Sequence, residues 1–133
     1  MAIMVPVTSL TGMILAPVFI RLAFGVIRKR REHRVAVGAG NHDDLESAIR
    51  AHGNFAEYVP IGLILMLTAE INGVPWWFVS MAGLMLVVGR LIHASAITTA
   101  NLKKRVTGMQ LTFGAIAVGV AANAYAMLKA LFP

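Results

Sequence analysis

The sequence has no cysteine and few charged residues. Without cysteine the chain cannot form disulfide bonds, bind a metal through thiolates or supply a thiolate nucleophile of its own. Charged residues make up 14% of the 133 residues, whereas an average soluble domain has about a quarter. So few charges cannot cover the large relative surface of a small soluble domain. The composition therefore argues against a soluble globular protein, and the high apolar content argues against intrinsic disorder.

Apolar residues make up 58% of the chain, and the mean hydropathy is +0.74. They gather in four stretches, at about 3–27, 55–71, 75–98 and 106–132, each near the roughly 20 residues that a helix needs to cross a bilayer. The alternating pattern of a membrane β-barrel is absent. Asp43 and Glu46 resemble a capping box that starts the second helix near residue 44. The sequence therefore predicts an all-α integral membrane four-helix bundle with helices at about 3–27, 44–71, 75–98 and 106–132. The first span is expected to be retained, because residues 1–10 lack the positive region of a signal peptide.

The basic residues predict the orientation of the bundle. They flank the first and third loops: Arg28, Lys29, Arg30, Arg31, Arg34, Arg50, Lys103, Lys104 and Arg105. By the positive-inside rule, loops 1 and 3 are cytoplasmic and both termini lie outside. The net charge of +6 is thus interpreted as a topology signal, and no nucleic-acid partner is expected.

Small residues at spacings of three and four predict close helix packing in lipid. One such face lies on the fourth helix, with Gly108, Thr112, Ala115, Gly119 and Ala122. A second lies on the first helix, with Thr8, Gly12 and Ala16.

Polar residues inside the spans need a reason, because ionisable groups are costly in lipid. Arg50, Asn54 and Glu57 fall on one face of the second helix, and Arg90 and His93 share a face of the third. These residues indicate a net-positive cluster near the cytoplasmic ends of the helices. Two interpretations stay open on the residues alone: a polar binding site, or an ion-pair scaffold that only holds the helices together. In the second, Arg90 either snorkels or pairs with Glu57 or with Glu70. A metal site is not expected, because His93 has no second ligand at suitable spacing.

The segment RAHGNFAEYVP at 50–60 resembles the signature of the MAPEG family, the membrane-associated proteins in eicosanoid and glutathione metabolism. The segment GRLIH at 89–93 is similar to the third-helix motif of the prostaglandin E synthase branch. The end of the first helix, at 26–35, is similar to that of the leukotriene synthase branch. Arg105 stands where these enzymes carry a catalytic arginine. The resemblance covers the whole chain, 1–133, as one domain of a small bacterial type.

This resemblance implies a homotrimer that binds glutathione between neighbouring protomers at the cytoplasmic ends of the helices, in a bacterial inner membrane. Arg105 would be catalytic by stabilising the glutathione thiolate, with Lys104 as the alternative, and Arg31 would lie near the second substrate. Ile97 departs from the family, because the eicosanoid enzymes have a tyrosine there. The positions that would bind glutathione are Arg30, Arg50, Asn54, Glu57, Tyr58, Arg90 and His93.

Two functions follow from the resemblance. The first is a glutathione-dependent membrane enzyme that conjugates glutathione to, or reduces, a lipophilic electrophile or peroxide. The alternative is a non-catalytic MAPEG-like membrane protein that binds lipid or a partner protein. A transporter or channel is disfavoured, because the chain shows neither broken helices nor an internal repeat.

Overall fold

The computed structural model describes residues 4–98 and 101–132, without the side chains of residues 97 and 98. Within these ranges the chain forms helices and no strand. The all-α prediction is therefore confirmed, and each of the four helices is long and apolar enough to cross a membrane. In order they are α1 (Pro6–His33), α2 (Asp43–Ile71), α3 (Trp76–Thr98) and α4 (Leu102–Leu131).

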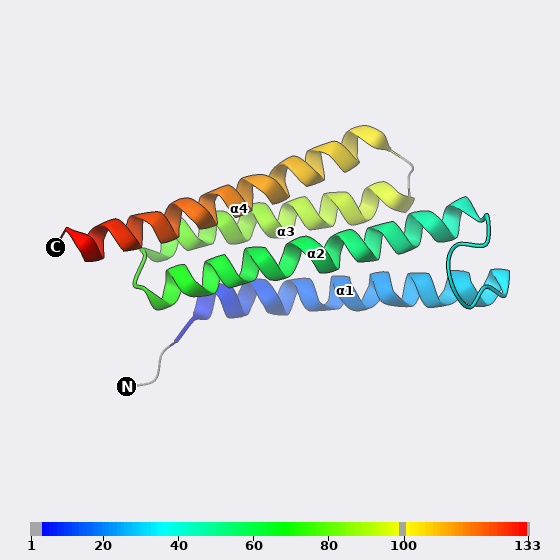
Figure 1. Ribbon diagram of the computed structural model, residues 1–133, viewed down its shortest axis with the longest axis horizontal. Coiled ribbons are helices and arrows are strands. Elements are labelled where there is room, and N and C mark those ends of the chain that lie inside the picture. The colour runs from blue at the N-terminus through cyan, green and yellow to red at the C-terminus, as the bar shows by residue number, and fades with distance from the viewer. Residues whose placement is uncertain (1–3, 99–100, 133) are drawn as a thin grey trace.

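The helices lie side by side along one axis (Figure 1). The start of α1, the end of α4 and the α2–α3 turn lie at one end of the bundle, and the α1–α2 loop lies at the other end (Figure 1). Within the described ranges α2 and α3 contact each other and both outer helices, whereas α1 and α4 do not meet. The α1–α2 loop and the start of α4, both predicted to be cytoplasmic, lie at the same end (Figure 1), although which side of the membrane they face stays a prediction.

Two helices, α1 and α4, extend well beyond one of the ends predicted for them. α1 continues through its basic residues to His33 and ends at Arg34, whose φ of 55° lies in the left-handed region. α4 begins at Leu102 rather than near 106, because the Asn101 side chain accepts a hydrogen bond from the backbone N–H of Lys104 at 3.1 Å. Hydropathy marks the length that lipid can cover, whereas the hydrogen-bonded caps determine where the helix ends.

The predicted capping box at the start of α2 is wrong. The helix begins at Asp43 after an N-cap residue, His42, that makes no side-chain cap bond. The Glu46 carboxylate instead accepts a hydrogen bond from Arg50 Nε at 3.0 Å, one turn further along the helix. Charge attraction to Arg50 therefore outcompetes the backbone N–H for this carboxylate.

The small-residue face of α4 is confirmed, because all five of its residues are buried. Its closest approach is to α3, where a Cβ added at Gly108 would lie 2.8 Å from the carbonyl oxygen of Gly89. The predicted face on α1 is not used within the chain: Gly12 has no neighbour within 4 Å of an added Cβ, and α1 buries Thr11 and Leu15 instead.

Glu70 connects the end of α2 to the start of α1. Its two carboxylate oxygens accept hydrogen bonds from the backbone N–H groups of Val7 and Thr8, both at 2.9 Å. These N–H groups have no partner inside the helix, and the negative charge is favourable at a helix N-terminus. Glu70 is thus a helix-end residue, at the end of the bundle opposite the basic loops.

Candidate functional site

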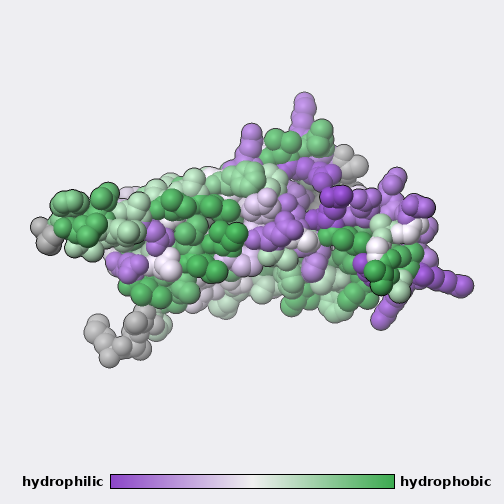
Figure 2. Space-filling view, viewed as in Figure 1, coloured by the Kyte–Doolittle hydropathy of each residue, from purple (hydrophilic) through white to green (hydrophobic). Residues whose placement is uncertain are grey.

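Polar side chains gather at the end of the bundle that contains the α1–α2 loop, whereas the other end is mostly apolar (Figure 2). Inside the bundle, Arg90 on α3 is 0% exposed although its guanidinium is charged. His93, one turn further along α3, is 4% exposed. A cation sealed from solvent in this way is rare and needs an explanation.

Polar groups from α2 and α3 hold the Arg90 guanidinium in place. Nη1 donates to Asn54 Oδ1 at 2.8 Å, and Nη2 lies 3.4 Å from His93 Nδ1. Because a guanidinium only donates, Nδ1 acts as the acceptor in this contact. The guanidinium carbon also lies 5.2 Å from the centroid of the Phe55 ring, within the range of a cation–π contact.

No carboxylate within the described part of the chain neutralises Arg90. Its Nε atom is buried and has no hydrogen-bond partner. The predicted pairing of Arg90 with Glu57 or Glu70 is wrong, because Glu57 is exposed and Glu70 caps α1. The chain therefore buries a positive charge without a negative one, which costs several kcal/mol.

The motif residues on α2 point in different directions within one chain. Asn54 faces α3, and Tyr58 packs edge-on against the Phe113 ring of α4 at 5.4 Å between centroids. Arg50 and Glu57 remain exposed. The structure thus brings Asn54, Arg90 and His93 together, and it leaves two of the predicted glutathione contacts on the outer surface of the protomer.

The basic residues near the loops differ in what they contact. Arg30 Nη1 donates to the backbone carbonyls of Ala36 and Gly38, at 3.1 and 3.0 Å, and so holds the α1–α2 loop. Arg31 is exposed at the end of α1. Arg105 is exposed in the first turn of α4, and its charge interacts electrostatically with His93. Position 97, where the family tyrosine would stand, lies outside the described side chains.

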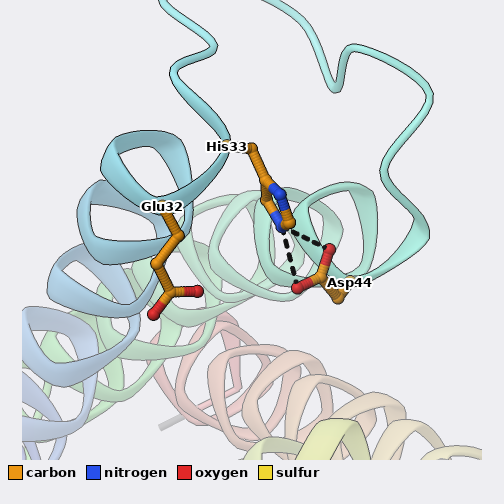
Figure 3. Close-up of side chains that lie close together, drawn as sticks. All are labelled: Glu32, His33 and Asp44. Carbon is orange, nitrogen blue, oxygen red and sulfur yellow. Dashed lines mark hydrogen bonds and ion pairs between the residues drawn. The ribbon is translucent and has the colours of Figure 1, made fainter.

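A further polar cluster, near the α1–α2 loop, was not indicated by the motifs. In it, Glu32, His33 and Asp44 bring ligand-type atoms within 4.8 Å of one another (Figure 3). His33 Nε2 lies 2.9 Å from Asp44 Oδ1. Lys29 Nζ lies 2.8 Å from Glu32 and 2.9 Å from Asp44, so an ammonium already occupies the space between the two carboxylates. We call these four residues the clasp, because they join the end of α1 to the start of α2. Only the spacing of opposite charges across the loop could have indicated it.

Comparison with known proteins identifies the family. The chain is 39% identical over 121 residues to "Inner membrane protein YecN" of Escherichia coli K12, an alignment that covers 91% of this chain and 92% of the relative. The YecN protein of Escherichia coli O6:H1 matches to the same extent. The model of the MAPEG family matches residues 8–125. This integral membrane four-helix protein therefore belongs to the MAPEG family.

Proposed function

We propose that this protein is a glutathione-dependent membrane enzyme that conjugates glutathione to, or reduces, a lipophilic electrophile or peroxide. The observation that carries the proposal is the buried Arg90 guanidinium, which has no carboxylate partner in the described chain. Guanidinium groups bind carboxylates through paired, charge-assisted hydrogen bonds. A ligand carboxylate would therefore recover much of the free energy lost when this charge is buried.

Glutathione suits the donors and acceptors at this end of the bundle. Its carboxylates match Arg90 and the arginines at the loops, and its amine matches the exposed Glu57 carboxylate. Its thiol would ionise more readily beside the exposed Arg105, because a nearby positive charge favours the thiolate. The sulfur, and not a protein cysteine, would then form the new bond to an electrophilic carbon, with Lys104 as the alternative cation.

The exposed positions of Arg50 and Glu57 support assembly as a homotrimer. A carboxylate on the outer surface of a membrane span is costly in lipid. Cover by a neighbouring protomer would place Glu57 beside the polar end of a second chain and would explain its exposure in one chain. Arg30 would then contribute to glutathione binding from the neighbour, and Arg31 would lie near the entry of the lipophilic substrate.

The membrane context fits this chemistry. A lipophilic electrophile dissolves in the bilayer, whereas glutathione is charged and comes from the aqueous side. The positive-inside rule puts the basic end in the cytoplasm and both termini outside. The name of the YecN relatives supports the inner membrane as the location.

Calorimetric titration of the detergent-solubilised protein with glutathione tests the proposal. We expect saturable binding that Arg90→Gln and Glu57→Gln each weaken about tenfold or more, since each variant leaves one ligand charge unpaired. Lys129→Gln, at the opposite end of the bundle, serves as the matched control and should bind normally. No binding by the wild type at millimolar glutathione contradicts the proposal.

The alternative is a non-catalytic membrane protein that binds lipid or a partner protein. It is favoured by the contacts that Arg90 already makes to Asn54 and His93, which are typical of a structural polar network. The ultraviolet difference spectrum of bound glutathione separates the two functions. An enzyme should show the thiolate band, which Arg105→Gln should diminish, whereas the alternative predicts glutathione bound as the thiol or not at all.

A further inference from the structure

A groove opens between α1 and α3 at the basic end of the bundle, with the first turns of α2 as its floor. Its volume is about 1150 Å³, slightly above the roughly 300–1,000 Å³ typical of small-molecule sites. α1 forms most of the lining, from Val18 to Glu32, and Leu91 and Ala94 form the wall on α3. The groove therefore spans the depth at which α1 changes from apolar to basic.

The lining changes in chemistry along the groove. Apart from Arg21, the deeper part of the α1 lining is apolar, with Val18, Leu22 and Phe24. The outer part carries Arg28 and the basic end of α1. At a rise of 1.5 Å per residue, Arg28 lies about 33 Å along the helix from Pro6, which corresponds to the hydrocarbon thickness of about 30 Å. The outer part thus lies at the level of the lipid headgroups.

Three arginines on this lining are free to bind an anion. Arg21 and Arg31 are exposed, and their side chains make no hydrogen bond or ion pair within the described residues. Arg28 reaches Glu32 only at 3.8 Å, and 73% of its side chain is exposed. Lys29, by contrast, is already neutralised in the clasp. The remaining acidic side chain of the lining, Asp43, lies at the first residue of α2, beside the loop.

Arg21 indicates the nature of the ligand. It lies about 10 Å deeper than Arg28 along the helix axis, where an unpaired guanidinium in lipid is costly. Its side chain can extend toward the headgroups, and it then meets the outer part of the groove. A soluble anion would satisfy the arginines but would leave the apolar depth of the groove empty.

We propose that this groove binds an anionic phospholipid of the surrounding leaflet, with its phosphate between Arg21 and Arg28 and one acyl chain along Val18 and Leu22. Arg31 would add a second contact to the headgroup. The site is separate from the Arg90 cluster, because none of Arg90, Asn54 and His93 lines the groove. The proposal therefore does not depend on glutathione binding.

Lipid enrichment tests this site. The protein is reconstituted in nanodiscs of mixed phosphatidylglycerol and phosphatidylethanolamine, extracted gently, and its bound lipids are counted by native mass spectrometry. We expect the wild type to retain phosphatidylglycerol preferentially, and Arg21→Gln and Arg28→Gln each to lower the enrichment about fivefold, since one arginine contributes about that factor with anionic lipid. Lys103→Gln, an exposed cation on α4 outside the groove, is the charge-matched control and should keep the enrichment.

A bulky substitution distinguishes lipid binding in the groove from general attraction of anionic lipid to the positive charge of the protein. Ala94→Trp fills the groove without a change of charge and should abolish the enrichment, whereas Ala117→Trp on the exposed side of α4 should keep it. Equal retention of both lipids by the wild type would overturn the proposal. So would an equal loss in Lys103→Gln, or displacement of the lipid by water-soluble glycerol phosphate. Chemical cross-links between the groove and a second copy of the chain, with no bound lipid, would assign the groove to the oligomer instead.

Discussion

Replacing Arg90 by methionine tests whether this cation serves to bind a ligand or to hold the bundle together. Methionine is long and flexible enough to occupy much of the same space. The surroundings already accept a thioether, because Met109 Sδ on α4 lies 3.9 Å from Arg90 Nη1. If Arg90 exists to hold the bundle together, its loss should unfold the protein. If Arg90 is kept buried for a ligand, the protein without ligand should tolerate its loss.

The magnitude follows from the contacts. The variant loses a charged hydrogen bond to Asn54, which contributes about 1.5–3 kcal/mol, and a cation–π contact with Phe55 of about 0.5–2 kcal/mol. It also avoids burying a guanidinium without a counter-ion, a penalty of several kcal/mol. The terms nearly cancel, so we expect Arg90→Met to be between neutral and about 2 kcal/mol more stable than the wild type. Glutathione should stabilise the wild type and leave the variant unchanged.

Unfolding by sodium dodecyl sulfate in mixed micelles, followed by far-ultraviolet circular dichroism, measures this difference with and without glutathione. Leu86→Met is the control, because Leu86 is fully buried one turn before Arg90 on α3 and the exchange conserves volume. A loss of more than about 2 kcal/mol in Arg90→Met, beyond that of Leu86→Met, would refute the reasoning and favour the structural role.

Three further predictions concern packing, capping and the surface. Gly108→Ala should destabilise the protein by about 1–3 kcal/mol, because the new Cβ meets the α3 backbone, whereas Gly12→Ala should change the unfolding midpoint little, since that position is open. Glu70→Ala should cost about 0.5–2 kcal/mol and speed amide hydrogen exchange in the first turn of α1, as measured by mass spectrometry. Arg50→Ala should change stability by less than about 0.5 kcal/mol, because its ion pair with Glu46 is exposed, yet it should weaken glutathione binding in calorimetry.

Hydropathy and charge predicted the fold because lipid imposes simple requirements on a chain. A span must satisfy its own backbone, so a long apolar stretch has to be a helix. The small residues on α4 also predicted its packing face. Within the bilayer the hydrophobic effect does not drive helices together, so association depends on the close packing that small residues allow. The face on α1 is not packed within the chain, because the space beside Gly12 is open on the surface of one protomer, and spacing alone does not distinguish an open glycine from a packed one.

The sequence identified Asn54, Arg90 and His93 as polar residues of the cluster, but it did not identify their contacts. The periodicity of α2 predicted one shared face for its polar residues, but spacing along a helix cannot say which neighbouring helix each side chain meets. Asn54 turned out to accept from Arg90, whereas Glu57 remained exposed. Glu46 was assigned to the helix cap, but Arg50 competes for it from one turn away. Such choices depend on distances between elements, which one-dimensional spacing does not contain.

The close contact of α3 and α4 at Gly89, the residue before Arg90, contributes to the burial of Arg90. Gly89 and Gly108 bring the α3 and α4 backbones so close that an added Cβ at either would lie within 3 Å of the opposite helix. Gly108 also lies against the backbone of His93, and Met109 Sδ lies 3.9 Å from Arg90 Nη1, so α4 contacts both Arg90 and His93. A bulkier pair would separate the helices, admit water or lipid to the guanidinium and weaken its attraction for an anion, because charge interactions are screened in a polar medium. The packing of small residues therefore supports the charge chemistry, because the close contact of α3 and α4 helps to keep the cation buried.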